Sequence, residues 1–311
     1  MTRGAGRFTP AGRTVVITGA SSGLGRAAAL HLAAVGFQVF AGVRAAADGE
    51  RLRAESPDGR LRPLRVDVTE PEQIRQAVDE VTRRLDGAGL WGLVNNAGVV
   101  QPGPLECLPA DQLRRQLDTN VIGQVETIQA FLPLLRVGRG RIVNVTSGLG
   151  RVALPYLGAY AAAQFAKEAI SDSLRRELRP YGVTVSVVQP GAIRTPIWEK
   201  VDRAGEEVIA DVPEATAALY RVPFRAFLRR NADQVRRSRT TPEQYARTVA
   251  RALTAARPRT RYPVGPDVRL ASLAARLLPD SLIDRNLTAL TRADPSPAAR
   301  PSDPVPTDFE R

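Results

Sequence analysis

The feature of this sequence that most constrains its fold is a repeated unit of a short β-branched run, a turn and a longer amphipathic stretch. The first unit begins with "RTVVITGA" (Arg13–Ala20), and a helix is predicted to follow from Gly23 to about Val35. The later strand-like runs are "FQVFAGVR", "LRPLRVDVT", "LWGLVNNAG", "GRIVNVTS", "GVTVSVVQPG" and "RYPVG". Strands that alternate with helices are joined by right-handed crossovers, which favours a parallel sheet covered on both faces. The sequence therefore predicts one doubly wound α/β domain.

The strand pattern pauses between Thr195 and Pro242, directly after the carboxyl end of a predicted strand. Ligands of open α/β sheets bind at that end, so we expect a helical lid insertion over about residues 196–241 of a domain spanning 13–266. C-terminal helices are predicted over 267–292, with a proline between them. Residues 1–12 are expected to form a flexible arm, and the Pro-rich, polar residues 293–311 a disordered tail.

The net charge of +12 comes almost entirely from arginines that are interleaved with acidic residues. No zinc-finger or RNP motif accompanies them, so no nucleic-acid partner is expected. The densest stretch, Arg221–Arg239, holds seven arginines and one acid. We interpret it as a solvated helix face; a basic cover over an acidic substrate, or contact with anionic lipid, are the alternatives.

The sequence contains no apolar run long enough to cross a bilayer, and its first residues lack the apolar core of a signal peptide. A single cysteine, Cys107, and a single histidine, His31, exclude an internal disulfide and supply no metal cluster. These observations predict a cytoplasmic protein without a metal.

The turn after the first strand, "TGASSGLG", carries Gly19, Gly23 and Gly25. Glycines at a strand-to-helix turn let backbone amides approach a pyrophosphate, and the following helix N-terminus favours negative charge. This turn predicts a Rossmann-like dinucleotide site.

The second strand ends "AGVR", where an NAD site usually has an acidic residue that binds the ribose hydroxyls. Val43 and Arg44 occupy that region instead. A guanidinium can bind a 2′-phosphate through charge-assisted hydrogen bonds, so we expect NADP(H) in preference to NAD. The alternative is that Arg44 is one more surface arginine of an arginine-rich protein.

The motifs "TGASSGLG", "VDVT", "NNAG", "TNVIG" and "QPGAIRT", with the spacing from Ser147 to Tyr160, resemble those of the short-chain dehydrogenase/reductase family. The resemblance covers about Arg13 to Thr195 and is strongest to the retinol dehydrogenase and 17β-hydroxysteroid dehydrogenase branch. It implies a small-molecule substrate, an NADP(H) or NAD(H) cofactor and a homo-oligomer, dimeric or tetrameric, with the Gly158–Arg179 helix as the usual contact.

The resemblance also implies a role for each matching residue. Asn120 would hold a water of the proton path, Ser147 would bind the substrate oxygen, and Tyr160 would exchange a proton with it. The residues implied to contact the cofactor are Gly19, Ser21, Ser22, Gly23, Leu24, Gly25, Arg44, Asp67, Val68, Asn95, Ala97, Gly98, Tyr160, Gln164, Pro190, Gly191, Ile193 and Thr195.

The chain departs from the family pattern in "AYAAAQFAKEA", where the fourth residue after Tyr160 is Gln164 and not lysine. In the family this lysine lowers the tyrosine pKa and holds the nicotinamide ribose. An amide can still hydrogen-bond the ribose but supplies no charge, so the pKa of Tyr160 is expected near its ordinary value of about 10. Tyrosine in its protonated form suits reduction, and alcohol oxidation should suffer more.

The nearest lysine, Lys167, lies about 10 Å along the helix from Tyr160. We expect it to face the surface or the lid, with substitution for the missing lysine as the alternative. The leading hypothesis is an NADP(H)-dependent reductase of a hydrophobic carbonyl compound. A non-redox enzyme (cyclase, dehydratase or isomerase) and a catalytically silent NADP-binding protein remain open.

Overall fold

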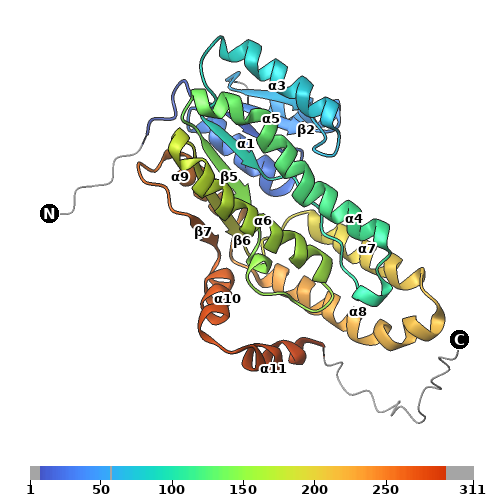
Figure 1. Cartoon of the computed structure of the whole chain (residues 1–311). Helices are drawn as coiled ribbons and strands as arrows, with labels where there is room; N and C mark the ends of the chain where they lie inside the picture. Colours follow the sequence, from blue (N-terminus) through green and yellow to red (C-terminus); the bar gives the residue numbers. More distant parts are fainter. Residues whose placement is uncertain (1–7, 57, 292–311) are drawn as a thin grey trace, which may run out of the picture.

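The computed structural model describes residues 8–56 and 58–291. Its centre is a parallel sheet of seven strands: β1 Thr14–Ile17, β2 Gln38–Val43, β3 Leu61–Arg65, β4 Gly92–Asn95, β5 Arg141–Val145, β6 Thr184–Pro190 and β7 Arg261–Val264. The strands lie in the order β3-β2-β1-β4-β5-β6-β7. Figure 1 shows β5, β6 and β7 of this sheet next to one another. Each strand falls within a predicted run, and the predicted α/β fold is confirmed.

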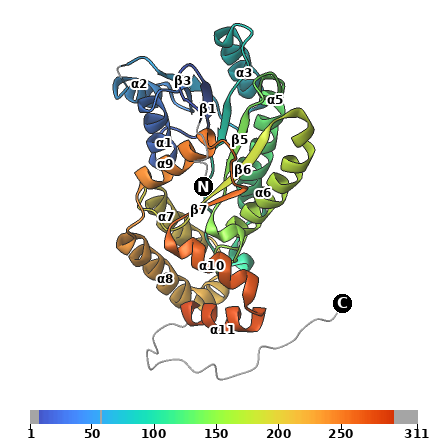
Figure 2. The ribbon, with the colours of Figure 1, turned by 90° about the vertical axis from the view of Figure 1, so that its left-hand side faces the viewer.

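Both faces of the sheet are buried, as β1 shows. Val15 and Ile17 face a core shared with α1 (Gly23–Ala34) and α9 (Pro242–Thr254). Val16 points to the other face, into a core shared with α3 (Pro71–Leu85) and α5 (Gly123–Val137), and α6 (Gly158–Glu177) continues this layer. Figure 2 shows the two helical layers on either side of the sheet. The continuous apolar strand is therefore explained by burial on both sides.

Helix α3 illustrates how the sequence pattern sets a helix. Pro71 occupies its first turn, where the missing N–H is tolerated, and Ile74, Ala77, Val81 and Leu85 form one buried face at helical spacing. Two further helices of the domain are α2 (Ala46–Ala54) and α4 (Ala110–Leu117).

The expected insertion over residues 196–241 forms two helices, α7 (Ile197–Ala210) and α8 (Glu214–Arg237), which pack on each other. They share a separate hydrophobic cluster that includes Val208, Phe224 and Phe227. Tyr156, from the loop before α6, joins it with ring centroids 5.2 and 5.4 Å from Phe224 and Phe227. This cluster attaches both helices to the segment before α6.

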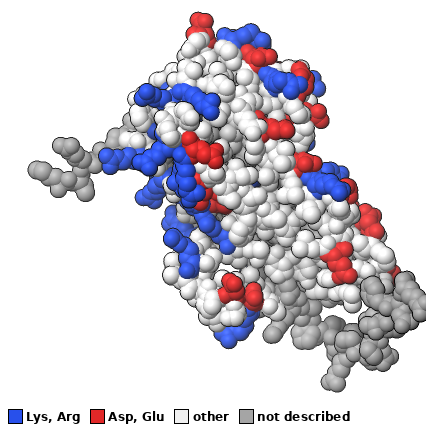
Figure 3. Space-filling model, viewed as in Figure 1, with Lys and Arg blue, Asp and Glu red and all other residues white. Residues whose placement is uncertain are grey.

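Three arginines of α8 are paired with nearby carboxylates. Arg221 binds Glu214, Arg225 binds Glu206 and Arg236 binds Asp233. On the face drawn in Figure 3, basic side chains gather on the left with a few acidic ones among them, smaller mixed groups lie at the upper right, and much of the rest is uncharged. These contacts support a solvated face for Arg221–Arg239, as we expected.

The chain continues beyond β7 with α10 (Pro266–Leu277) and α11 (Asp280–Thr291), separated by Pro279 as predicted. Among residues 8–56 and 58–291, no helix has the length and apolarity needed to cross a bilayer. The predicted tail, residues 293–311, lies outside the described residues.

The expected flexible arm is only partly covered, because residues 1–7 are not described. From Phe8 onward the chain is attached to the body: the Phe8 N–H donates to the Thr254 carbonyl at 2.7 Å. Its ring lies 5.2 Å from that of Trp91, over which the Arg13 guanidinium stacks at 3.5 Å. Residues 8–12 therefore differ from the prediction, because aromatic and cation–π contacts hold them.

Candidate active site

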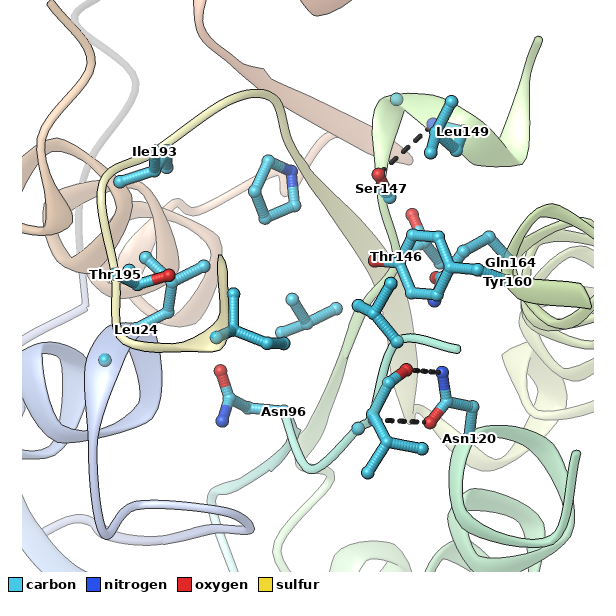
Figure 4. Close-up of a pocket in the computed structure, with 18 of the residues that line it drawn as sticks. Leu24, Asn96, Asn120, Thr146, Ser147, Leu149, Tyr160, Gln164, Ile193 and Thr195 are labelled. Carbon is cyan, nitrogen blue, oxygen red and sulfur yellow. Dashed lines mark hydrogen bonds between the residues drawn. The ribbon is translucent and has the colours of Figure 1, made fainter. Parts of the chain in front are cut away.

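A cavity of about 810 Å³ opens at the carboxyl ends of the strands. Figure 4 shows Ser147 and Tyr160 on one side of it and Leu24, Ile193 and Thr195 on the other. The predicted residues that line it are Gly19, Ser21, Ser22, Gly23, Leu24, Gly25, Arg44, Asp67, Val68, Ala97, Gly98, Asn120, Ser147, Tyr160, Gln164, Pro190, Gly191, Ile193 and Thr195. Asn95 is the one predicted residue outside this lining.

The glycine turn depends on the absence of side chains. Gly19 has φ +66°, and a Cβ on Gly25 would lie 2.1 Å from the Gly19 carbonyl oxygen, too close for any other residue. Ser22 precedes α1 and its side chain makes no capping hydrogen bond. The first N–H groups of α1 therefore have no side-chain cap, and residues Ser22–Gly25 line the cavity.

Asn95 does not line the cavity as we expected, and its neighbour Asn96 does. The Asn95 amide is buried behind the cavity wall and donates to Asn144 Oδ1 at 2.9 Å. Asn96 lines the cavity, and its amide donates to the carbonyls of Thr18 and Gly19. The reason is strand alternation: consecutive side chains at the end of β4 point in opposite directions.

Arg44 and Asp67 stand at the outer end of the cavity. Their charged atoms are 3.9 Å apart, and the Arg44 side chain is 74% exposed. Asp67 Oδ1 accepts hydrogen bonds from the backbone and hydroxyl of Thr69. Arg44 is thus held only weakly, and its guanidinium is available to an anion.

Asn120 lies in a single π-helical turn, Asp118–Ile122, between α4 and α5. Its amide is fixed by two bonds to Val99, accepting from the N–H at 2.8 Å and donating to the carbonyl at 2.9 Å (Figure 4). Such π-turns interrupt regular hydrogen bonding and occur often at functional sites. The side chain of Asn120, fixed in this turn, lines the cavity.

Ser147 follows β5 and Tyr160 lies in the first turn of α6, and their hydroxyls point toward each other (Figure 4). Burial raises the pKa of Tyr160 to about 12, although its interaction with Ser147 acts in the opposite direction. This pKa exceeds the value near 10 that we expected, because desolvation adds to the lack of a cation at Gln164. Tyr160 is therefore protonated at neutral pH.

Gln164 and Lys167 lie on the same buried face of α6, and both line the cavity. Lys167 does not lie at the surface, the first of the two places that we expected for it, because the residue is only 2% exposed. Burial lowers the pKa of Lys167 to about 8, while the charge of Glu168 raises it. Gln164 Oε1 is buried without a hydrogen-bond partner.

A buried carboxylate, Glu168, connects α6 to the strands beside the site. It accepts hydrogen bonds from Thr146 at 2.8 Å, Gln189 at 2.9 Å, Arg151 at 3.1 Å and Arg261 at 2.8 Å. Thr146 precedes Ser147, and Gln189 precedes Pro190. This network therefore fixes two walls of the cavity to the helix that carries Tyr160.

Sequence reasoning missed the far wall of the cavity. Trp198 and Gln234 line it from α7 and α8, and Ala271, Ala274, Leu278 and Leu287 line it from α10 and α11. Asp267 accepts a hydrogen bond from the Ala192 N–H at 2.8 Å and fixes the loop after β6. No local pattern marks such residues, because only the packing of the C-terminal helices brings them to the site.

In residues 8–56 and 58–291, no group of three or more metal-ligating side chains is assembled.

The comparisons with known proteins agree with this geometry. The short chain dehydrogenase family model matches residues 13–206. A 3-amino-tetrahydro-pyrrolizinone reductase of Xenorhabdus hominickii is 44% identical over 88% of this chain and 93% of its own length. Retinol dehydrogenase 5 of Mus musculus is 40% identical over 88% of this chain and 87% of its own length.

Solved structures show the same fold. A short-chain dehydrogenase from Burkholderia cenocepacia in complex with NADP superimposes with a TM-score of 0.69 at 25% identity, covering 90% of this chain and 99% of its own. One from Burkholderia phymatum in complex with NAD has a TM-score of 0.73 at 24% identity, covering 96% and 99%. With a family match over more than half of its length and relatives this similar along nearly all of it, the chain belongs to the short-chain dehydrogenase family.

Proposed function

We propose that this protein is an NADP(H)-dependent reductase that converts a carbonyl group of a hydrophobic small molecule into an alcohol. The observation that carries this proposal is the Ser147–Tyr160 pair, with the pKa of Tyr160 raised to about 12 at the end of a largely apolar cavity. A relative that is 44% identical is named as a reductase, which supports the same direction.

The chain's own residues fit a dinucleotide. The uncapped N–H groups at the start of α1 favour a pyrophosphate, and the bare backbone of Gly25 keeps the turn tight enough to present them. Arg44, weakly paired with Asp67, is placed to bind a 2′-phosphate, which supports NADP(H) over NAD. When bound, the reduced nicotinamide supplies the hydride that the carbonyl carbon accepts.

The side chains of this site handle the charge that develops on the carbonyl oxygen. Ser147 donates a hydrogen bond to that oxygen, and Tyr160 transfers its phenolic proton to it. The carbonyl group is thereby converted into an alcohol. Asn120, Gln164 and the predicted water path would return a proton to the tyrosinate. Alcohol oxidation requires Tyr160 to lose its proton first, which a pKa of about 12 disfavours near neutral pH. Reduction is therefore the favoured direction.

The test is NADPH oxidation by the purified protein against a panel of hydrophobic ketones and aldehydes, with product mass as the second readout. We expect turnover with a product two hydrogens heavier than its substrate. Gln164 motivates the alternatives, because it replaces the lysine of the family motif. A product changed by any other mass would indicate non-redox catalysis, and tight NADPH binding with no turnover would indicate a silent cofactor-binding protein.

Assembly and location remain predictions. We propose a cytoplasmic homo-oligomer that associates through the outer face of α6, where Phe165 is exposed. Light scattering of the purified protein tests the assembly, and a monomeric mass would contradict it.

A further inference from the structure

Lys167 is one of only two lysines in the sequence, and α6 carries it into the interior of the molecule. Across the residues that the structure describes, no hydrogen bond or salt bridge joins its ammonium to another group. The adjacent carboxylate, Glu168, is already bound by Arg151 and Arg261. An unpaired cation in a protein interior is unfavourable, so its presence in this cavity calls for a partner.

Gln164 has the complementary deficiency. Its Oε1 is buried without a donor, and it lies one helical turn before Lys167, on the same face. Helical side chains lean toward the N-terminus, so the lysine extends over Gln164 in the direction of Tyr160. The donor without an acceptor and the acceptor without a donor are therefore neighbours.

A second unpaired acceptor belongs to the same layer. Asn95 Oδ1 is also buried without a donor, while the Asn95 amide donates to Asn144. Asn144 donates to Ser171 at 2.9 Å, and Ser171 donates to the Lys167 carbonyl at 2.6 Å. This chain of bonds fixes the end of β4 against the turn of α6 that carries the lysine.

We propose that Lys167 is a positioning residue that supplies the positive charge missing from position 164. Rotation of its side chain within the cavity brings the ammonium to Gln164 Oε1, to which it then donates a hydrogen bond that is not formed in the structure described here. The bond orients the amide so that its N–H groups face the cavity, and the ammonium favours the tyrosinate form of Tyr160 after proton transfer. The inference rests on the proposed reductase function. In this proposal the positive charge of the site comes from residue 167 of α6 and not from residue 164, where the family motif has its lysine.

The charged surroundings are compatible with an ammonium at neutral pH, because the pKa of Lys167 is about 8. On α6 the titratable neighbours are Tyr160 and Glu168, and Arg151 and Arg261 approach through Glu168. Asp118 of the π-turn is exposed, as are the charged residues of α4: Asp111, Arg114 and Arg115.

The test compares Lys167→Met, Gln164→Lys and the double variant Gln164→Lys/Lys167→Met with the natural protein. We expect Lys167→Met to lower kcat about 10- to 100-fold, with little change in KM for the carbonyl. The double variant should recover the natural rate, since it returns a cation to the helix. A natural rate in Lys167→Met would overturn the proposal, and so would a folded double variant as slow as the single one.

A readout without turnover separates this inference from the proposed function. In protein labelled with ¹³C-lysine only Lys167 and Lys200 give signals, and Lys200→Arg assigns them. We expect Gln164→Leu to lower the titration midpoint of Lys167, because the ammonium loses its acceptor. A midpoint that does not move rejects the inference. Absence of turnover in the natural protein, with the midpoint shifted as expected, rejects only the reductase function.

Discussion

The glycine turn and the buried face of α6 lie on opposite sides of the same cavity, and their constraints differ in kind. The glycine turn requires the absence of a side chain, because a Cβ at Gly25 would collide with the Gly19 carbonyl. The α6 face works through the polar side chains that it carries, namely the half-buried Tyr160 and the buried Gln164, Lys167, Glu168 and Ser171.

This difference teaches how each part of the site can change. A backbone cradle admits no substitution, because the requirement is steric and sits at one atom. Charge on a helix face can be supplied from neighbouring turns, because residues three and four apart share that face. The chain has the glycine turn of the family motif, and on α6 it has Gln164 where that motif has lysine.

Tyr160→Phe should have the largest effect on the α6 side. Removing the phenolic proton leaves no donor for the carbonyl oxygen, so the rate of NADPH-dependent reduction should fall about 10²–10⁴-fold. Steady-state kinetics measure the rate, and NADPH fluorescence should show that cofactor binding survives. Unchanged turnover would exclude Tyr160 as the acid. The α6 face would then no longer differ from the glycine turn by supplying a reacting side chain.

Gly25→Ala should disrupt the glycine turn, which lies on the opposite side of the cavity from α6. Its Cβ would lie 2.1 Å from a backbone oxygen, and the turn must open to relieve that contact. We expect NADPH affinity to fall by roughly 100-fold, because the amides that bind the pyrophosphate move. Titration by fluorescence measures this affinity.

Gly158→Ala is the matched control for Gly25→Ala. The three atoms nearest to the new Cβ all belong to the side chain of Leu105, at 3.0–3.1 Å, and Leu105 is exposed and free to move. NADPH affinity should stay near its natural value. Equal losses in both variants would mean that any added methyl group disturbs the protein, and the special role of the turn would fail.

The two regions also differ in how far sequence reasoning reaches. Strands, the glycine turn and the Pro71 start of α3 follow from local rules, because β-branched runs, glycine and proline act within a few residues. Placing Ser147 and Tyr160 at one cavity required the resemblance to a family, since the residues come from different elements.

Side-chain direction and tertiary packing set what sequence reasoning could not reach. Alternation at the strand end decides between Asn95 and Asn96, and a one-residue uncertainty reverses the answer. Lys167 was expected outside because an isolated lysine is rarely buried. The wall built from α10 and α11 depends on how two C-terminal helices fold back, which no local pattern encodes.

Lys167→Met should raise stability while it lowers activity. Below pH 8 the buried ammonium opposes folding, because its pKa is about 8 in the folded state against an ordinary 10.5. That difference corresponds to about 3 kcal/mol, so a gain of roughly 2–3 kcal/mol in unfolding free energy is expected at pH 7.

The pH dependence of that gain gives its control. The unfolded chain binds the lysine proton more readily between about pH 8 and 10.5, so the natural protein recovers stability across that range. Urea unfolding of both proteins at pH 7 and pH 10 should show the gain shrinking at the higher pH. A gain equal at both values would point to better packing by methionine, with no contribution from the charge.

Arg44→Ala should produce the smallest of these effects. It tests whether Arg44, on the cofactor side of the cavity, determines the preference for NADPH. The guanidinium is 74% exposed and only loosely paired with Asp67, so water screens much of its attraction for a phosphate. We expect kcat/KM for NADPH to fall about tenfold while the value for NADH stays constant, because only NADPH carries a 2′-phosphate. Arg225→Gln is the control, since that arginine is bound by Glu206 on α8 and should affect neither cofactor. A parallel fall with both cofactors would show that Arg44 supports the turn itself, and cofactor preference would then depend on groups elsewhere in the cradle.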